Sequence, residues 1–268
     1  FEQIQLKQQK PFTSSCNRCK GAQSSHGLDS PPFPNKDSPL FALTPFEIGA
    51  IQLSLKVAGL ALLGCLPMGL LAAWVLARCD FYGKSLLNGF IHLPLVLPPV
   101  VVGYLLLVLF GKQGALGRWL WETFEVSIAF SWKGAAVAAG IMAFPLMVRS
   151  IRLSLELVDT GLEDAARTLG ASPKWVFITI TLPLILPGLL TGTILTFARS
   201  LGEFGATITF VSNIPGETQT LPLALYSLTQ APDGDLGALR LVVISVVISL
   251  AALIASEALS RRINNRLR

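Results

Sequence analysis

From about residue 50 onward, long apolar runs alternate with short polar loops. Uncharged, hydrophobic runs occupy residues 57–77, 85–111, 134–148, 175–198 and 241–256. A helix needs about 20 apolar residues to cross the hydrocarbon core of a bilayer, so three of these runs suffice unaided. The two shorter runs reach that length if Lys133, Arg149 and Glu257 lie at the membrane interface, where long basic side chains extend toward water. The pattern predicts an all-α membrane protein with five transmembrane helices, over about residues 51–78, 86–111, 132–152, 176–200 and 240–259.

The overall composition agrees with this prediction. Mean hydropathy is +0.60, 52% of residues are hydrophobic and 14% are charged, whereas an ordinary soluble domain has about 25% charged residues. The alternative is a large soluble protein with buried helices. The length of the uncharged runs disfavours it.

Residues 1–44 differ from everything after them. This arm is rich in Gln, Ser, Pro, Lys and Asn and has no apolar periodicity, so we expect it to be disordered. Cys16 and Cys19 have half of the spacing of a zinc ribbon, but no second Cys pair follows and His26 stands alone, which makes a metal site there a minor alternative. Residues 45–262 are the predicted transmembrane domain, and residues 263–268 a basic tail.

The distribution of basic residues predicts the orientation. Loops 78–84 and 149–174 and the tail 257–268 together hold ten Lys and Arg residues, whereas loops 112–133 and 199–240 hold five. Short loops rich in Lys and Arg stay on the cytoplasmic side. We therefore expect a cytoplasmic C-terminus. The basic residues of the arm oppose this orientation, but long segments follow the rule poorly.

One of these loops contains a short helix with signals at both ends. Thr160 and Glu163 have the spacing of a capping box, Gly170 is suited to a left-handed stop, and Ser172-Pro173 is suited to starting the next helix. Apolar residues lie on one face of the nine-residue helix, namely Leu162, Ala165, Ala166 and Leu169. So short a helix needs a packing partner, which is either the rest of this chain or another protein.

This loop resembles the cytoplasmic EAA loop of ABC-transporter permeases. The family pattern is Glu-Ala-Ala, three residues, Gly, nine residues and Ile-x-Leu-Pro; here Asp164-Ala165-Ala166, Gly170 and Ile180-x-Leu182-Pro183 match it, with Asp in place of the usual Glu. The resemblance implies that residues 159–183 hold a coupling helix, which lodges in a cleft of a separate ATPase subunit. The implied ATPase-coupling residues are Glu163, Asp164, Ala165, Ala166, Leu169, Gly170 and Pro183.

Other segments are similar to the molybdate permease subfamily within the oxyanion importers. They are residues 92–104 (HLPLVLPPVVVGY), 144–149 (FPLMVR), 197–206 (FARSLGEFGA) and 210–218 (FVSNIPGET). The resemblance implies the five-helix, type I importer permease fold in a bacterial inner membrane. It also implies a homodimer that forms the anion pathway, two cytoplasmic ATPase subunits and an external molybdate-binding protein. A sulfate or thiosulfate permease is the alternative, and an ATP-independent secondary carrier a more distant one.

Prolines and an expected ion pair mark the candidate pathway. Pro94, Pro98 and Pro99 are expected to break or kink the second apolar run, and broken helices are common at transporter sites, although a purely structural kink explains them equally well. Arg199 and Glu203 are four residues apart, which predicts an ion pair. The candidate pathway or gate residues are Pro98, Pro99, Arg199, Ser200, Gly202, Glu203, Gly205 and Thr207.

The sequence shows no catalytic pattern. It contains no Ser/His/Asp grouping, no paired carboxylates within the apolar runs and no phosphate-binding GxxxxGK[ST] loop. We expect a transport subunit rather than an enzyme, with no cofactor or metal of its own, and with ATP and Mg²⁺ bound by the partner ATPase. The net charge of +5 is explained by the basic loops and arm, so we expect the lipid bilayer, and no nucleic acid, as a partner.

Overall fold

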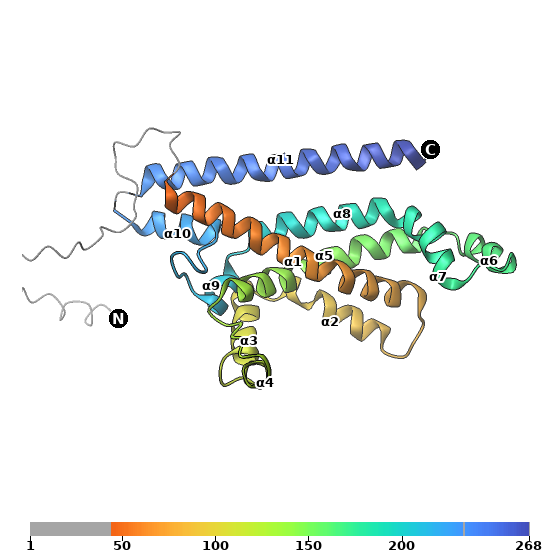
Figure 1. Cartoon of the computed structure of the whole chain (residues 1–268), viewed down its shortest axis with the longest axis horizontal. Helices are drawn as coiled ribbons and strands as arrows, with labels where there is room; N and C mark the ends of the chain where they lie inside the picture. Colours follow the sequence, from red (N-terminus) through yellow and green to blue (C-terminus); the bar gives the residue numbers. More distant parts are fainter. Residues whose placement is uncertain (1–43, 233, 268) are drawn as a thin grey trace, which may run out of the picture. The chain divides into compact units, whose positions relative to one another are not determined.

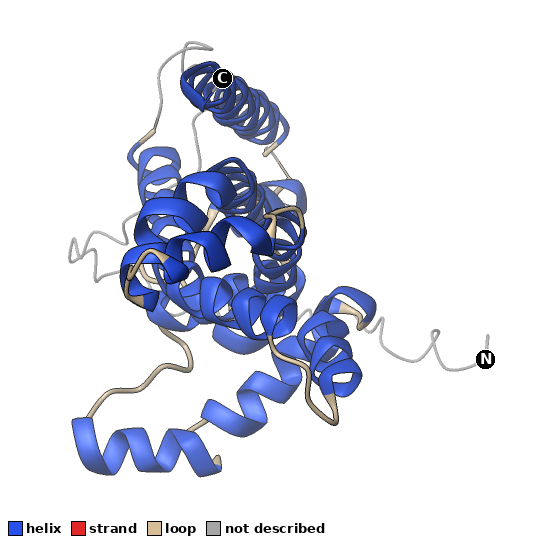
Figure 2. Ribbon diagram, turned by 90° about the vertical axis from the view of Figure 1, so that its right-hand side faces the viewer, coloured by secondary structure: helices blue, strands red, loops and turns tan. Residues whose placement is uncertain are grey.

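The computed structural model describes residues 44–232 and 234–267, and every regular element in these ranges is helical (Figures 1 and 2). Except for Thr44, the predicted N-terminal arm lies outside the described residues, as does the Cys16–Cys19 pair. The elements in chain order are α1 (Pro45–Arg78), α2 (Lys84–Val96), α3 (Pro99–Phe110), α4 (Ala115–Phe124), α5 (Trp132–Glu156), α6 (Thr160–Thr168), α7 (Pro173–Val176), the π-helix η2 (Phe177–Thr181), α8 (Leu182–Leu201), α9 (Gly205–Val211), α10 (Leu221–Gln230) and α11 (Asp235–Leu267).

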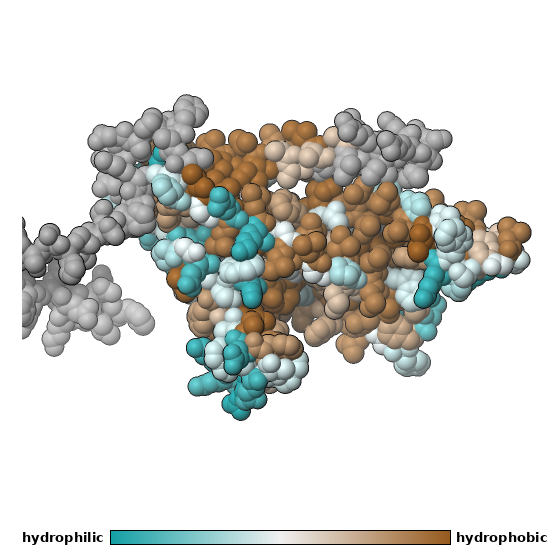
Figure 3. All heavy atoms as spheres, in the orientation of Figure 1, coloured by the Kyte–Doolittle hydropathy of each residue, from teal (hydrophilic) through white to brown (hydrophobic). Residues whose placement is uncertain are grey.

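Four helical segments are long and apolar enough to cross a membrane. They are Pro45–Arg78, Trp132–Glu156, Pro173–Leu201 and Asp235–Ala255, and the bent pair α2–α3 brings the number among the described residues to as many as five. Hydrophobic residues cover much of the visible face between the two ends of these helices, whereas hydrophilic residues gather around α4 and near α7 (Figure 3). This distribution fits a chain whose middle section lies in lipid.

The second predicted span is broken, as its prolines indicate. Helix α2 ends at Val96 and α3 begins at Pro99, and their axes differ by 112°. Pro94 lies inside α2, whereas Pro99 occupies the first position of α3, where its missing N–H leaves no helical bond unmade. The expected break in this run is therefore confirmed, and it divides the span over 86–111 into two shorter helices.

Helix α5 is the centre of the packing. It contacts α1 and α8 along most of its length, and its buried face is rich in small residues such as Ala135, Ala139 and Ala143. Small side chains let neighbouring helix backbones approach closely, which is how helices associate where lipid removes the hydrophobic driving force. Along this face the central helices are held together by close contact, and larger buried side chains such as Met147 and Ile151 fill the rest of the interface.

A buried ion pair joins the first and last helices. Thr44 caps α1 through a reciprocal capping box with Glu47, which places the Glu47 carboxylate at the start of the helix. Glu47 Oε1 lies 3.2 Å from Arg240 Nε on α11, and both side chains are buried. Its effect is to hold the start of α11 against the start of α1.

The opposite end of these helices carries the loop with the short helix. In Figure 1, the end of α1, the start of α2, helices α6 and α7 and the end of α11 lie together at that end. Helices α4, α9 and α10 are short and were not predicted as helices, although α9 falls in the uncharged run 204–216, which is too short to span a membrane and fits a re-entrant or interfacial segment. In Figure 1, α6, which holds predicted coupling residues, lies at one end of the long helices, whereas α9, which holds predicted pathway residues, lies toward the other end.

Candidate functional site

Helix α6 begins with a cap that differs from the predicted one. The Asp159 side chain accepts a hydrogen bond from the Gly161 backbone N–H at 2.8 Å, and Asp159 is the N-cap residue. The predicted capping box of Thr160 and Glu163 is wrong. Glu163 does not reach back to the helix start, because its carboxylate is engaged by residues from two other elements.

The Glu163 carboxylate lies at the junction of three elements. Arg78 Nη2, in the last turn of α1, lies 2.9 Å from Glu163 Oε1, and the Thr181 hydroxyl donates to the same oxygen at 2.7 Å. Glu163 is only 8% exposed, although it belongs to a helix that is otherwise mostly on the surface. A carboxylate so buried is stable when it is paired and hydrogen-bonded, and this one is both.

The apolar face of α6 has no cover within the described part of the chain. Leu162 is 52% exposed and Leu169 is 89% exposed. Ala165 is exposed and Ala166 half-buried beside them, while Asp164 forms a surface ion pair with Arg167 at 3.3 Å. Exposed leucines beside small residues form a surface suited to contact with another protein.

The segment after α6 turns sharply and then continues into a spanning helix. Gly170 has φ +88°, the left-handed conformation predicted for it, which costs glycine little. Pro173 starts α7, the π-helix η2 follows, and Pro183 lies in the first turn of α8. The predicted coupling residues thus lie on one continuous path from α6 to α8.

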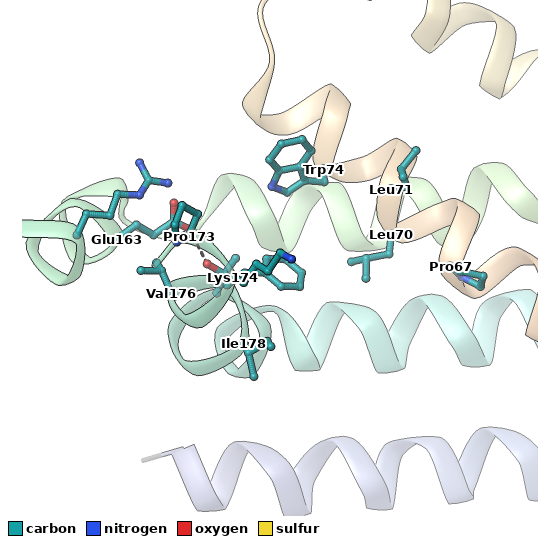
Figure 4. A pocket seen from close by; sticks show the side chains of 12 residues that line it. Pro67, Leu70, Leu71, Trp74, Glu163, Pro173, Lys174, Val176 and Ile178 are labelled. Carbon is teal, nitrogen blue, oxygen red and sulfur yellow. Dashed lines mark hydrogen bonds between the residues drawn. The ribbon is translucent and has the colours of Figure 1, made fainter. Parts of the chain in front are cut away.

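A cavity of about 670 Å³ lies beside this path. One wall comes from α1, with Pro67, Leu70, Leu71 and Trp74, and the other from α7 and η2, with Val176 and Ile178 among its residues (Figure 4). Glu163 lies at its α6 side. The cavity separates α1 from η2 at this level.

A second group of predicted residues gathers where α3, α8 and α9 meet. A Cβ atom built on Gly205 would lie 2.7 Å from Pro99 Cβ, and one built on Gly103 would lie 2.6 Å from the Ala206 carbonyl oxygen. Only glycine permits such approach, so α9 packs directly on the start of α3. Two segments that are far apart in the sequence therefore form one unit.

The predicted ion pair of Arg199 and Glu203 is present in this region. Arg199 Nη1 lies 2.7 Å from Glu203 Oε2, and Glu203 Oε1 accepts a hydrogen bond from the Ala206 backbone N–H at 3.0 Å. Glu203 is 3% exposed. Its carboxylate thereby joins the end of α8 to the start of α9.

The remaining candidate pathway residues are placed differently. Ser200 and Thr207 are buried, whereas Pro98 and Gly202 are exposed. No cluster of three or more His, Cys, Asp and Glu residues suited to a metal ion occurs within residues 44–232 and 234–267.

Sequence reasoning missed Arg78 and Thr181 as members of the loop cluster. Arg78 is 85 residues away from Glu163 along the chain, and Thr181 is 18 residues away. A basic residue directly after the first apolar run indicates a membrane boundary, but no local spacing connects it to a particular carboxylate. The buried pairing depends on the packing of α1 against α5.

Comparison of the sequence with known proteins identifies its family. The model of the family described as "Binding-protein-dependent transport system inner membrane component" matches residues 66–265. A relative from Escherichia coli K12, "Molybdenum transport system permease protein ModB", is 61% identical over 219 residues, which is 82% of this chain and 96% of the relative. Its Haemophilus influenzae counterpart of the same name is 59% identical over 221 residues, again 82% of this chain and 96% of the relative.

A solved structure extends the comparison to the fold. The bacterial ABC transporter for import of the acidic polysaccharide alginate matches with a TM-score of 0.67 and 19% identity, over 82% of this chain and 80% of that chain. At this identity the match concerns only the fold, which is that of the membrane subunits of ABC importers.

Proposed function

The chain belongs to the binding-protein-dependent transport system inner membrane components, and on that premise we propose that it forms the path by which an ABC importer brings molybdate into the cell. The observation that carries this proposal is the 61% identity to a molybdenum transport system permease, which extends over 96% of that relative. The chain is thus a molybdenum transport permease rather than one for sulfate or thiosulfate.

Family membership fixes several coarser properties. The chain is a multi-pass, inner-membrane component and is not catalytic. ATP is bound by a partner ATPase, and an importer of this family also works with a binding protein. The energy for transport therefore comes from outside this chain.

The finer assembly is part of the proposal. Two copies of the chain form the pathway, two ATPase subunits bind on the cytoplasmic side, and an external binding protein delivers molybdate. The C-terminus is cytoplasmic. This orientation is supported by the basic loops and by the common location of α6, the α1–α2 connection and the end of α11 at one end of the helices.

Helix α6 is the proposed coupling helix. Its apolar face, with Leu169 and Ala165 exposed and Ala166 half-buried, fits a cleft on the ATPase, and the exposed carboxylate of Asp164 supplies a polar contact. ATP binding draws the two ATPases together and displaces α6, which converts an inward-facing pathway to an outward-facing one. Pro98, Pro99, Arg199, Ser200, Gly202, Glu203, Gly205 and Thr207 remain the proposed pathway or gate residues.

Uptake by reconstituted vesicles tests the cargo. Vesicles containing the chain, its ATPase and the binding protein are expected to accumulate labelled molybdate with ATP, and to accumulate much less labelled sulfate. Uptake without ATP would favour a secondary carrier. A preference for sulfate would overturn the cargo while leaving the importer architecture in place.

Cysteine crosslinking tests the coupling surface. In a background without native cysteines, Leu169→Cys is expected to crosslink to the ATPase. The matched control is Leu236→Cys, because Leu236 is also exposed but lies at the start of α11, at the other end of the helices. Labelling of Leu169→Cys by lipid reagents alone, or crosslinks only within the chain, would refute the role of α6.

A further inference from the structure

The ion pair of Arg78 and Glu163 has no role in capping α6, because Asp159 is the N-cap residue. A basic residue at a membrane boundary also needs no carboxylate partner on another helix. Arg78 ends α1, yet its guanidinium contacts a carboxylate on α6 at 2.9 Å, with side-chain exposures of 18% and 11%. Charges that are largely shielded from water attract one another more strongly than charges on an open surface. This contact is therefore stronger than the surface pair of Asp164 and Arg167 on the same helix.

Helix α6 has few other attachments to the body of the chain. Glu163 is the buried residue of α6, while the neighbouring side chains are exposed or half-buried. Directly beside the ion pair, the cavity of about 670 Å³ keeps the Leu70–Trp74 wall of α1 away from η2 (Figure 4). A displacement of α6 can therefore reach the end of α1 through the carboxylate of Glu163.

We propose that Arg78 is a positioning residue, which through Glu163 makes the end of α1 follow the movement of α6. This inference rests on the proposed function, in which α6 contacts the ATPase. Separating the pair leaves each of the two shielded charges without its opposite charge, so the contact resists displacement. Thr181, bonded to the same oxygen, connects the start of α8 to the same point. Helices α1 and α8 both pack on α5, so the three helices respond together.

The test measures how much molybdate is transported per ATP hydrolysed. In vesicles with the ATPase and the molybdate-loaded binding protein, Arg78→Gln is expected to lower this ratio about tenfold, a usual size for the loss of coupling between two sites. Arg78→Lys, which keeps the positive charge, is expected to restore most of the ratio.

The matched control is another ion pair at the same end of the helices. Lys84 donates a hydrogen bond of 2.8 Å to Asp80, and this bond, together with the ammonium charge, lowers the pKa of the Asp80 carboxyl. The Asp80 side chain is 97% exposed, and the pair spans only one turn. Asp80→Asn is expected to leave the ratio unchanged.

One result would overturn the proposal, namely an unchanged ratio in Arg78→Gln. Equal decreases of uptake and ATP hydrolysis also leave the ratio unchanged, and they would assign Arg78 to assembly alone. If Arg78→Gln fails to insert, Thr181→Val replaces it, since it removes one hydroxyl at nearly constant volume and is expected to lower the ratio less strongly. Failure of the ATPase to copurify with the unmodified chain would instead refute the proposed function.

Discussion

The role of single residues is clearest at Gly170, where the backbone requires glycine. Its φ of +88° places it in the left-handed region, and a Cβ there would meet no atom within 4 Å. The requirement is therefore conformational and not steric. A residue with a side chain costs about 1–2 kcal/mol in this conformation, Asn being better tolerated than most.

This leads to a prediction about turn geometry. Gly170→Val is expected to reduce molybdate uptake, because the strained turn reorients α6 relative to α7. Gly170→Asn is expected to retain most of the uptake. Both variants are compared in reconstituted vesicles at equal protein content. Equal activities of the two would contradict a conformational role for this position.

Local signals along the chain predicted some residues of the site but not others. The left-handed turn at Gly170 depends on the residue at that one position, and Arg199 and Glu203 are only four residues apart. Both features could therefore be predicted from local sequence. Glu163 was assigned to a capping box, since Thr160 lies at the right spacing. Its actual partner Arg78 is distant in sequence, and Asp159 offers a competing cap.

At the scale of elements, the close contact of α3 and α9 depends on two glycines, Gly103 on α3 and Gly205 on α9. Gly103→Ala is expected to destabilise the protein by about 1–3 kcal/mol, because the added Cβ would lie 2.6 Å from the Ala206 carbonyl oxygen. The measurement is the thermal unfolding midpoint in detergent. Gly59→Ala is the control, since no atom lies within 4 Å of its added Cβ and alanine is the better helix former. A midpoint of Gly103→Ala at or above that of the control would contradict the close packing.

The longer helices could be predicted from the sequence, and so could the short helix α6, which has signals at both ends, whereas the other short helices could not. Runs such as 57–77 and 175–198 exceed what a soluble helix needs, so their existence followed from hydropathy. Helices α4 and α9 have 10 and 7 residues, too few to show a period, and the π-helix η2 depends on a local shift in hydrogen bonding. The prolines predicted the break between α2 and α3, but not its angle of 112°.

At the scale of the whole chain, the ion pair of Glu47 and Arg240 connects α1 and α11, the first and the last candidate spans along the described residues. Glu47→Gln is expected to lower the unfolding midpoint, since removing one charge of a buried pair costs about 3–5 kcal/mol. The double variant Glu47→Met with Arg240→Met is expected to be less destabilised, because it removes both buried charges and puts apolar side chains in their place. An unchanged midpoint in Glu47→Gln would contradict a structural role for the pair.

The orientation in the membrane also belongs to this scale. A green fluorescent protein fused after residue 268 is expected to fluoresce in bacteria, because it folds in the cytoplasm but not after export through the general secretory route. Alkaline phosphatase at the same position is expected to be inactive, since it needs an oxidising compartment to form its disulfides. The reverse pair of results would invert the proposed orientation of α6 and the ATPase.

The break between α2 and α3 shows how a chain can bend sharply in a membrane protein. Any corner in a helix normally exposes amide protons, and hydrocarbon offers nothing to accept them. Pro98 and Pro99 have no amide proton, while the N–H of Leu97 still donates to Leu93 and that of Val101 to Pro98. The two prolines therefore reduce the number of donors that need an acceptor at this corner. Replacing these prolines with alanine would add two amide protons at the bend, each of which would need an acceptor.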